Sequence, residues 1–148
     1  MIGMNFMTVE FLDTNILVYA FDRGAGVRHD GAKALFQRLT QSGTGVVSVQ
    51  VLQEWVNTVT RKVREPLSLG DVRYWLHVFI QANWQIAVPQ ASDLVVAVDI
   101  MERWQLSWWD ALIVTMAQSA GATVLWTEDL NAGQVLGSLT VRNPFRES

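Results

Sequence analysis

Four acidic residues stand where the pattern of this sequence could place chemistry: Asp13, Glu54, Asp110 and Asp129. Asp13 directly follows a short apolar run at residues 8–12, and Asp129 comes shortly after the most hydrophobic run, residues 122–126. Glu54 and Asp110 each lie in about the first turn of an expected helix. Because the carboxyl ends of parallel strands and the starts of the helices that follow share one edge of a sheet, all four carboxylates are expected to converge.

A cluster of four carboxylates restricts the possible chemistry. Taking even two of them out of water costs several kcal/mol, so either their pKa values rise or a cation lies among them. The chain has no cysteine and only His29 and His77 as histidines, which excludes thiolate and histidine-rich metal sites. Oxygen ligands alone favour Mg²⁺ or Mn²⁺. The set therefore predicts metal-assisted hydrolysis of a phosphodiester, in which the metal polarises the phosphate and activates a water.

Each acid also has a purely structural explanation. Asp13 could cap a helix, Asp110 could complete a capping box with Ser107, Asp129 could be a turn residue, and Glu54 could be an ordinary surface glutamate. Four such coincidences at one edge are less expected than one shared site. The 14 acids less these four are ten, against 11 bases, so the net charge of −3 belongs to the expected site.

The helix that Ser107 opens is the element around which the chain is organised. Ser107 and Asp110 have the spacing of a capping box, and residues 111–117 are almost entirely apolar. A helix that is apolar on all sides is buried on all sides. Gly121 is expected to end it.

The other elements alternate between strand and helix. Strands are expected at residues 8–12, 46–49, 84–88, 122–126 and 138–141, and helices at residues 16–21, 28–41 and 50–64 and after Ser68 and Ser92. The inward faces of the last three helices are expected to carry Leu52, Val56, Val59 and Val63; Val72, Trp75, Leu76 and Phe79; and Leu94, Val95, Val98 and Met101. This alternation predicts an α/β fold with three layers and a mostly parallel central sheet.

Length and composition are those of one globular domain over residues 1–148, with half of the residues hydrophobic and 17% charged. No apolar run approaches the roughly 20 residues of a membrane helix, and residues 1–7 lack the features of a signal peptide, so a cytoplasmic location is expected. Seven bases against two acids between Arg23 and Arg64 could mark a polyanion-binding surface, although a solvated helix face is the simpler explanation.

Four motifs now stand in one order along the chain: Leu12-Asp13-Thr14-Asn15-Ile16, Gln53-Glu54-Trp55, Ser107-Trp108-Trp109-Asp110-Ala111 and Trp126-Thr127-Glu128-Asp129. The ordered set resembles the PIN-domain family, and within it the VapC-type toxins of bacterial toxin–antitoxin pairs. The resemblance implies an endoribonuclease that depends on Mg²⁺ or Mn²⁺, with Asp13, Glu54, Asp110 and Asp129 as its metal site. It also implies a small cognate antitoxin that blocks the site, and a homodimer.

Several polar residues match positions that support such a site in the family: Thr14, Asn15 and Thr127. The Asn15 amide could hold the Asp13 carboxylate in register, or it could be an ordinary polar residue of the first helical turn. Ser48 is equally ambiguous, and the pair Trp108-Trp109 is expected to pack in the core. The candidates for contact with the RNA backbone are Arg61, Arg28 and Lys62, with Lys33 and Arg64 as weaker ones.

Three other functions compete with this one. A catalytically silent PIN-like module could bind RNA or a protein, although such a module has no need of four acids. A phosphotransferase with Asp13 as nucleophile would need a second acid at Asn15 or a late lysine, and the chain has neither. A related nuclease acting on structured DNA would need a helical clamp or basic insertion that the sequence lacks.

Overall fold

The computed structural model describes residues 8–146, which form one six-stranded sheet in the order β3-β2-β1-β4-β6-β5. The strands are β1 (Glu10–Leu12), β2 (Gly45–Ser48), β3 (Gln85–Ala87), β4 (Val124–Trp126), β5 (Val135–Leu136) and β6 (Leu139–Arg142). All pairings are parallel except that of β5 with β6. The predicted α/β class with a mostly parallel sheet is confirmed. The two-residue strand β5 was not predicted, because two residues carry no periodicity.

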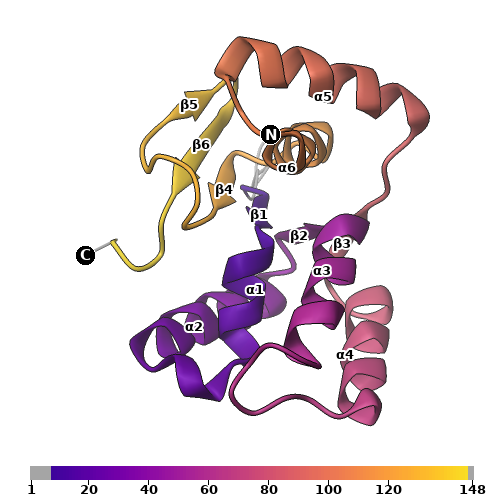
Figure 1. Ribbon diagram of the computed structural model, residues 1–148, viewed down its shortest axis with the longest axis vertical. Coiled ribbons are helices and arrows are strands. Elements are labelled where there is room, and N and C mark those ends of the chain that lie inside the picture. The colour runs from indigo at the N-terminus through magenta and orange to yellow at the C-terminus, as the bar shows by residue number, and fades with distance from the viewer. Residues whose placement is uncertain (1–7, 147–148) are drawn as a thin grey trace, which may run out of the picture.

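Within the described residues, six α-helices surround the sheet: α1 (Thr14–Phe21), α2 (Val27–Ser42), α3 (Val49–Val59), α4 (Leu69–Gln81), α5 (Ala91–Trp104) and α6 (Trp108–Ser119). A short 3-10 turn, Arg23–Ala25, joins α1 to α2. Figure 1 shows α5 and α6 together on one side of the central strands and α1 to α4 on the other. The expected three layers are therefore present, and no described helix is long and apolar enough to cross a membrane. The expectation about a signal peptide falls on residues 1–7, outside the described residues.

The strand β1 and the helix α6 form the centre of the core. All three residues of β1 are buried, and so are the seven residues 111–117 of α6, as their apolar pattern predicted. Glu10 is the one acid inside this strand. Its carboxylate accepts hydrogen bonds from both terminal nitrogens of Arg38 and from the Trp126 indole, at 2.9 to 3.0 Å. Burial alone would raise the pKa of Glu10, but these partners lower it overall.

The expected helix over residues 50–64 is shorter in the structure. α3 ends at Val59, and the backbone N–H of Leu67 donates to the Val59 carbonyl at 2.9 Å. That carbonyl is the acceptor that residue 63 would need to continue the helix, so the chain turns instead. Trp55 is fully buried on α3 against Phe21 and Phe79, a role that the predicted apolar stripe did not include.

The prediction for α5 is wrong in two respects. The helix begins at Ala91 rather than after Ser92, because Asp93 accepts a hydrogen bond from the Gln90 N–H at 2.7 Å and so closes the first turn earlier. Its buried residues are Ala97 and Ile100. The predicted inward residues Leu94, Val95 and Val98 are instead 45 to 66% exposed. α5 packs mainly against one helix, α6, so only a narrow stripe is covered.

The helix after Ser68 follows its prediction closely. The Ser68 hydroxyl accepts the backbone N–H of Asp71 at 3.1 Å and caps α4. Val72 and Phe79 are buried, and Trp75 and Leu76 are half-buried. The predicted start of this helix after Ser68 and its predicted inward face are confirmed.

Candidate active site

Asp13 is the centre of the candidate site. It follows β1 directly and caps α1, where its Oδ1 accepts the backbone N–H of Thr14 at 2.7 Å. Its Oδ2 accepts the hydroxyl of Thr127 at 2.7 Å from the end of β4, the neighbouring strand. Asp13 is only 6% exposed although its side chain is an acid. The strand order of the sheet therefore fixes this carboxylate from two directions.

Burial raises the pKa of Asp13 to about 7, in spite of the two hydrogen bonds, which lower it. The negative charges of Asp129 and Asp110 raise it further. Three of the four predicted acids thus interact electrostatically across the ends of β1 and β4 and the start of α6. A carboxylate in this condition gains stability either from a proton or from a cation.

Thr127 and Asp129 form the second part of the site. The Thr127 hydroxyl donates to Asp13 and accepts the backbone N–H of Asp129 at 3.0 Å. Thr127 is fully buried, whereas the side chain of Asp129 is exposed. One hydroxyl therefore joins the loop that carries Asp129 to the buried carboxylate.

Glu54 belongs to α3, a helix that packs against α1. Its Oε1 accepts the Thr14 hydroxyl and the Gln50 amide, each at 3.1 Å. Glu54 and Asp129 line the same open cavity of about 340 Å³ with Thr14, Asn15, Val18, Tyr19 and Thr58. The cavity is large enough to admit part of a substrate, and its lining includes one acid from α3 and one from the loop after β4.

Asp110 lies in the first turn of α6, as predicted. The Ser107 hydroxyl caps this helix by accepting the backbone N–H of Asp110 at 3.2 Å. The carboxylate of Asp110 is half-buried and has no hydrogen bond among the described residues. The explanation of Asp110 as a purely structural residue needs its side chain to bond back to the cap, and no such bond is present. Its carboxylate is therefore available to a ligand.

Asn15 carries an unusual feature for the first turn of a helix. Both its amide nitrogen and its amide oxygen are buried without a hydrogen-bond partner. Leaving a buried polar group unpaired costs about 1–3 kcal/mol, so such a group usually serves a ligand or an ordered water. It follows Asp13 by two residues and lines the same cavity as Glu54 and Asp129.

The donor set fits a hard cation, although the side chains are not yet gathered around one. Across residues 8–146, no group of three acidic or histidine side chains stands close enough to hold a metal ion. The carboxylates nevertheless surround one edge of the sheet, Asp110 lacks a partner and the Asn15 amide is orphaned. These carboxylate and amide oxygens are ligands of the kind that Mg²⁺ and Mn²⁺ prefer.

The basic residues are distributed less simply than predicted. Arg61 and Lys62 are exposed just after α3, one turn beyond Thr58 of the cavity wall. Arg28 is held in an ion pair with Glu128 at 2.6 Å. Lys33 lines a different pocket, and Arg64 lies with its aliphatic stem against Gly24, at the opposite end of α1 from Asp13.

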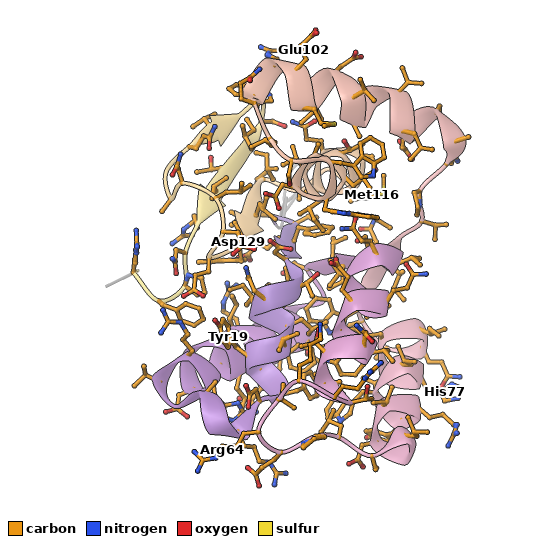
Figure 2. All side chains as sticks on the ribbon, viewed as in Figure 1. Tyr19, Arg64, His77, Glu102, Met116 and Asp129 are labelled. Atoms are coloured by element: carbon orange, nitrogen blue, oxygen red, sulfur yellow. The ribbon has the colours of Figure 1, made fainter. Side chains whose placement is uncertain are left out.

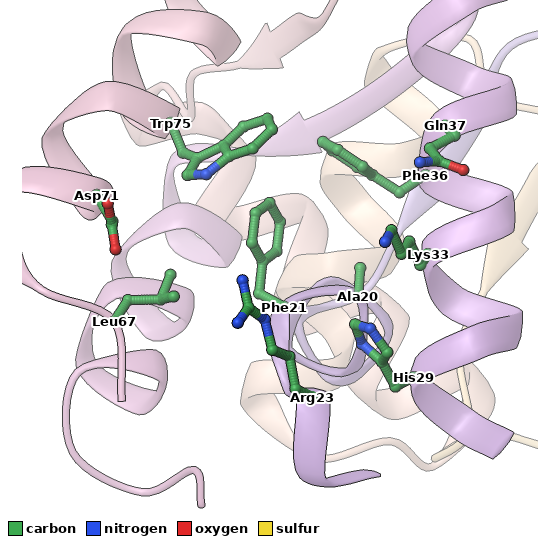
Figure 3. A pocket seen from close by; sticks show the side chains of 10 residues that line it. All are labelled: Ala20, Phe21, Arg23, His29, Lys33, Phe36, Gln37, Leu67, Asp71 and Trp75. Atoms are coloured by element: carbon green, nitrogen blue, oxygen red, sulfur yellow. The ribbon is translucent and has the colours of Figure 1, made fainter. Parts of the chain in front are cut away.

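The pocket that contains Lys33 is separate from the acids. It has a volume of about 320 Å³, lies among α1, α2 and α4, and is lined by Phe21, Phe36 and Trp75 with Arg23, Lys33 and His29 (Figure 3). It opens at the C-terminal end of α1, whereas Asp13 stands at the N-terminal end. The candidate site is therefore identified by its acidic residues and not by the presence of the pocket that contains Lys33.

Three further residues correct or extend the predictions. Trp109 is 62% exposed, so the expectation that both tryptophans pack in the core is wrong for Trp109 and holds in part for half-buried Trp108. The first turn of α6 turns one indole outward. Ser48 is fully buried and caps α3 by accepting the Val51 N–H at 3.2 Å, which gives it a structural role.

Sequence reasoning missed Gln50, Tyr19 and Glu128. Gln50 shares a helix face with Glu54 four residues later, a spacing that could have indicated their hydrogen bond. Tyr19 donates to Glu128 across 109 residues of sequence, and no local pattern signals such a contact. Figure 2 shows Tyr19 and Asp129 on the same flank of α1.

Known structures resemble this chain over most of its length. A toxin–antitoxin complex from Klebsiella pneumoniae aligns with 20% identity and a TM-score of 0.65, covering 91% of this chain and 97% of the other. VapBC2 from Rickettsia felis, bound to a DNA fragment from its promoter, aligns with 20% identity and a TM-score of 0.61 over 92% and 98% of the two chains.

A third structure is VapC20 from Mycobacterium tuberculosis, a toxin that cleaves the sarcin–ricin loop. It aligns with 17% identity and a TM-score of 0.59 over 78% of this chain and 86% of that one. No curated protein sequence matches the chain. The model of the PIN domain family matches residues 11–135, a span that begins at β1 and contains all four acids. The chain therefore belongs to the PIN-domain family.

Proposed function

We propose that this protein is a metal-dependent endoribonuclease and the toxin of a type II toxin–antitoxin pair. The observation that carries the proposal is the buried Asp13 carboxylate, whose pKa is raised to about 7 by burial and by Asp129 and Asp110. A fold that needed only a helix cap would not place two more acids around it. Membership of the PIN-domain family and the likeness to toxin structures support the same conclusion.

Asp13, Asp110, Asp129 and Glu54 would hold Mg²⁺ or Mn²⁺, with the Asn15 amide oriented toward Asp13 or a bound water. The bound ion would supply polarisation of the scissile phosphate and a more acidic water. The chain's own part is positional. Thr127 holds Asp13 and the Asp129 backbone in register, Thr14 and Gln50 hold Glu54, and Ser107 fixes the start of the helix that carries Asp110.

The substrate is proposed to be RNA whose backbone crosses the cavity toward Arg61 and Lys62. These two bases are exposed and lie beside the wall that Thr58 contributes. A lysine or arginine that contacts a phosphate releases counterions, so RNA binding becomes weaker and less dependent on salt when that residue is removed. Replacing Arg61 by Gln should therefore lower the slope of log affinity against log salt by about 1.

The partner is proposed to be a small antitoxin that covers this site, since the similar structures include a toxin–antitoxin complex and VapBC2. We also propose a homodimer and a cytoplasmic location, where RNA is available as substrate. Neither depends on the identity of the RNA.

The decisive experiment is cleavage of a pool of structured RNAs by the purified protein in Mg²⁺, Mn²⁺ or EDTA, beside the Asp13→Asn variant. Metal-dependent cutting that the variant loses is the expected result. The same substitution at an exposed aspartate of α5, Asp99→Asn, is the matched control and should cut RNA as the wild type does. Full activity in Asp13→Asn would overturn the assignment of the site.

A silent RNA- or protein-binding module is the second candidate. It is favoured by one observation, that within the described chain no three acids are gathered around a common point. No cutting under any metal, together with tight binding of RNA or of a partner protein, would establish this function in place of the first.

A further inference from the structure

We infer that Glu128, held by Tyr19 and Arg28, is a positioning residue that determines where the neighbouring Asp129 presents its carboxylate. The inference rests on the proposed metal site and names a part of its support that lies outside the four acids. It also gives Arg28 a role different from contact with the RNA backbone.

The contacts of Glu128 are short and come from two helices. Its Oε1 accepts the Tyr19 hydroxyl of α1 at 2.9 Å, and its Oε2 accepts the Arg28 Nε of α2 at 2.6 Å. Each oxygen of the Glu128 carboxylate therefore accepts a hydrogen bond from a different helix. Because α1 and α2 pack tightly against each other, these two donors form a rigid support for the loop after β4.

Phe145 covers this cluster from the C-terminal segment. The Arg28 guanidinium carbon lies 5.9 Å from the centre of the Tyr19 ring and 5.4 Å from the centre of the Phe145 ring. The two rings meet edge to face with centroids 5.5 Å apart. A guanidinium over two aromatic rings, with its Nε bonded to a carboxylate, has little freedom to turn toward a phosphate.

The loop that carries Asp129 is therefore anchored on both sides. On the inner side the Thr127 hydroxyl accepts the Asp129 N–H and donates to Asp13. On the outer side the Glu128 carboxylate is tied to α1 and α2. Asp129 itself is exposed and has no side-chain hydrogen bond among the described residues, so its position depends on these two anchors.

The cluster is poorly explained as a device for stability alone. The side chain of Arg28 is 48% exposed, and ion pairs at such positions contribute little to the free energy of unfolding. Groups that orient a metal ligand through a hydrogen bond, in contrast, alter metal affinity by roughly tenfold or more. The inference therefore predicts a small loss of stability and a larger loss of metal affinity when the cluster is broken.

The test measures the affinity of the purified full chain for Mn²⁺ by calorimetry, with thermal unfolding of the metal-free protein alongside. Tyr19→Phe removes one hydroxyl without changing any charge, and should weaken Mn²⁺ binding by about tenfold. The chain has two tyrosines, and the other, exposed Tyr74, gives the matched control Tyr74→Phe, which should bind as the wild type does.

Arg28→Gln separates positioning from simple electrostatics by the sign of its effect. Removing a positive charge near the acids should tighten Mn²⁺ binding if only charge matters, whereas loss of the support for Glu128 should weaken it. Arg73→Gln, at an exposed arginine on α4, controls for the change in net charge.

RNA binding gives a second readout. Arg28→Gln should leave the salt dependence of RNA affinity unchanged, whereas Arg61→Gln should lower its slope by about 1.

The outcomes distinguish this inference from the proposed function. Wild-type protein that binds no Mn²⁺ would overturn the metal site and this inference together. Mn²⁺ binding by the wild type that Tyr19→Phe leaves unchanged would overturn the inference alone. Tighter binding in Arg28→Gln, or a lowered salt slope in that variant, would assign Arg28 to electrostatics or to RNA contact instead.

Discussion

At the scale of single residues, Asp13 is the group that most clearly departs from ordinary behaviour. It has two good hydrogen bonds, which would normally keep a carboxylate charged, yet burial raises its pKa to about 7 from an ordinary value of 3.8. The metal-free folded state therefore binds a proton at Asp13 more tightly than the unfolded state does. This difference makes a direct prediction about stability and pH.

The contribution of Asp13 to stability is full below about pH 4 and is lost as pH rises toward its folded pKa near 7. Asp13→Asn removes this loss, because an Asn amide does not ionise and its oxygen can still accept the Thr14 N–H. In EDTA, the free energy of unfolding of the variant should rise relative to that of the wild type by about 1 kcal/mol for each pH unit between pH 5 and 7. Urea unfolding at each pH measures this, and parallel profiles for the two proteins would contradict it.

Thr127 supplies the second prediction at this scale. Its hydroxyl joins Asp13 to the Asp129 backbone, so Thr127→Val leaves a buried carboxylate with one donor fewer and the Asp129 N–H without its acceptor. We expect a loss of about 1–3 kcal/mol in the free energy of unfolding, and weaker Mn²⁺ binding. Thr123→Val, at an exposed threonine before β4, should stay within about 0.5 kcal/mol of the wild type. Equal stabilities for the two variants would show that the shared hydroxyl has no such role.

At the scale of helices and strands, the sequence predicts where residues lie when adjacency along the chain determines their position. Asp13 comes directly after β1, and β1 pairs with β4, so the topology of a parallel sheet brings Asp13 and the Thr127–Asp129 loop together. Ser107 caps α6 as its spacing to Asp110 predicts, and α4 begins after Ser68 as predicted. These features follow from local chemistry and one general rule about parallel sheets.

Features that depend on which distant element of the chain packs against a residue could not be predicted from the local sequence pattern. The apolar residues of α5 have helical spacing, yet only Ala97 and Ile100 are buried, because a single helix, α6, covers this face. The tie between Tyr19 and Glu128 spans 109 residues. Trp55 is buried by helices on both sides, which its own surroundings in the sequence do not reveal.

At the scale of the whole molecule, the core and the candidate site lie in separable parts of the fold. The largest fully buried side chains come from helices and strands throughout the fold, with Trp55 on α3, Phe11 on β1 and Phe79 on α4 the bulkiest. Asp13, Asp110 and Asp129 stand instead at the edge where β1 and β4 end and α6 begins. The protein is therefore expected to fold without metal and to gain stability when metal binds. Metal at about 100 times its Kd should add about 2.7 kcal/mol, measurable as a rise in Tm.

The outer face of α5 bears on how copies of this chain associate. Leu94, Val95 and Val98 are exposed there although they are large and apolar, and the structure places no described element over them. In the proposed homodimer, a second copy would cover this row, since burial of apolar area is the main driving force of association. An interaction of this kind is independent of the acids, which stand at the edge where β1 ends.

The dimer prediction is tested by Val95→Glu combined with Val98→Glu. Both side chains are more than half exposed, so the variant should keep its fold and its thermal transition while losing self-association in light scattering. Val27→Glu is the matched control, because Val27 is 80% exposed at the start of α2 and away from α5. A wild-type protein that stays monomeric at high concentration would refute the dimer. A double variant that still dimerises would place the interface on another face, since two buried carboxylates per copy would have to be removed from water at this one.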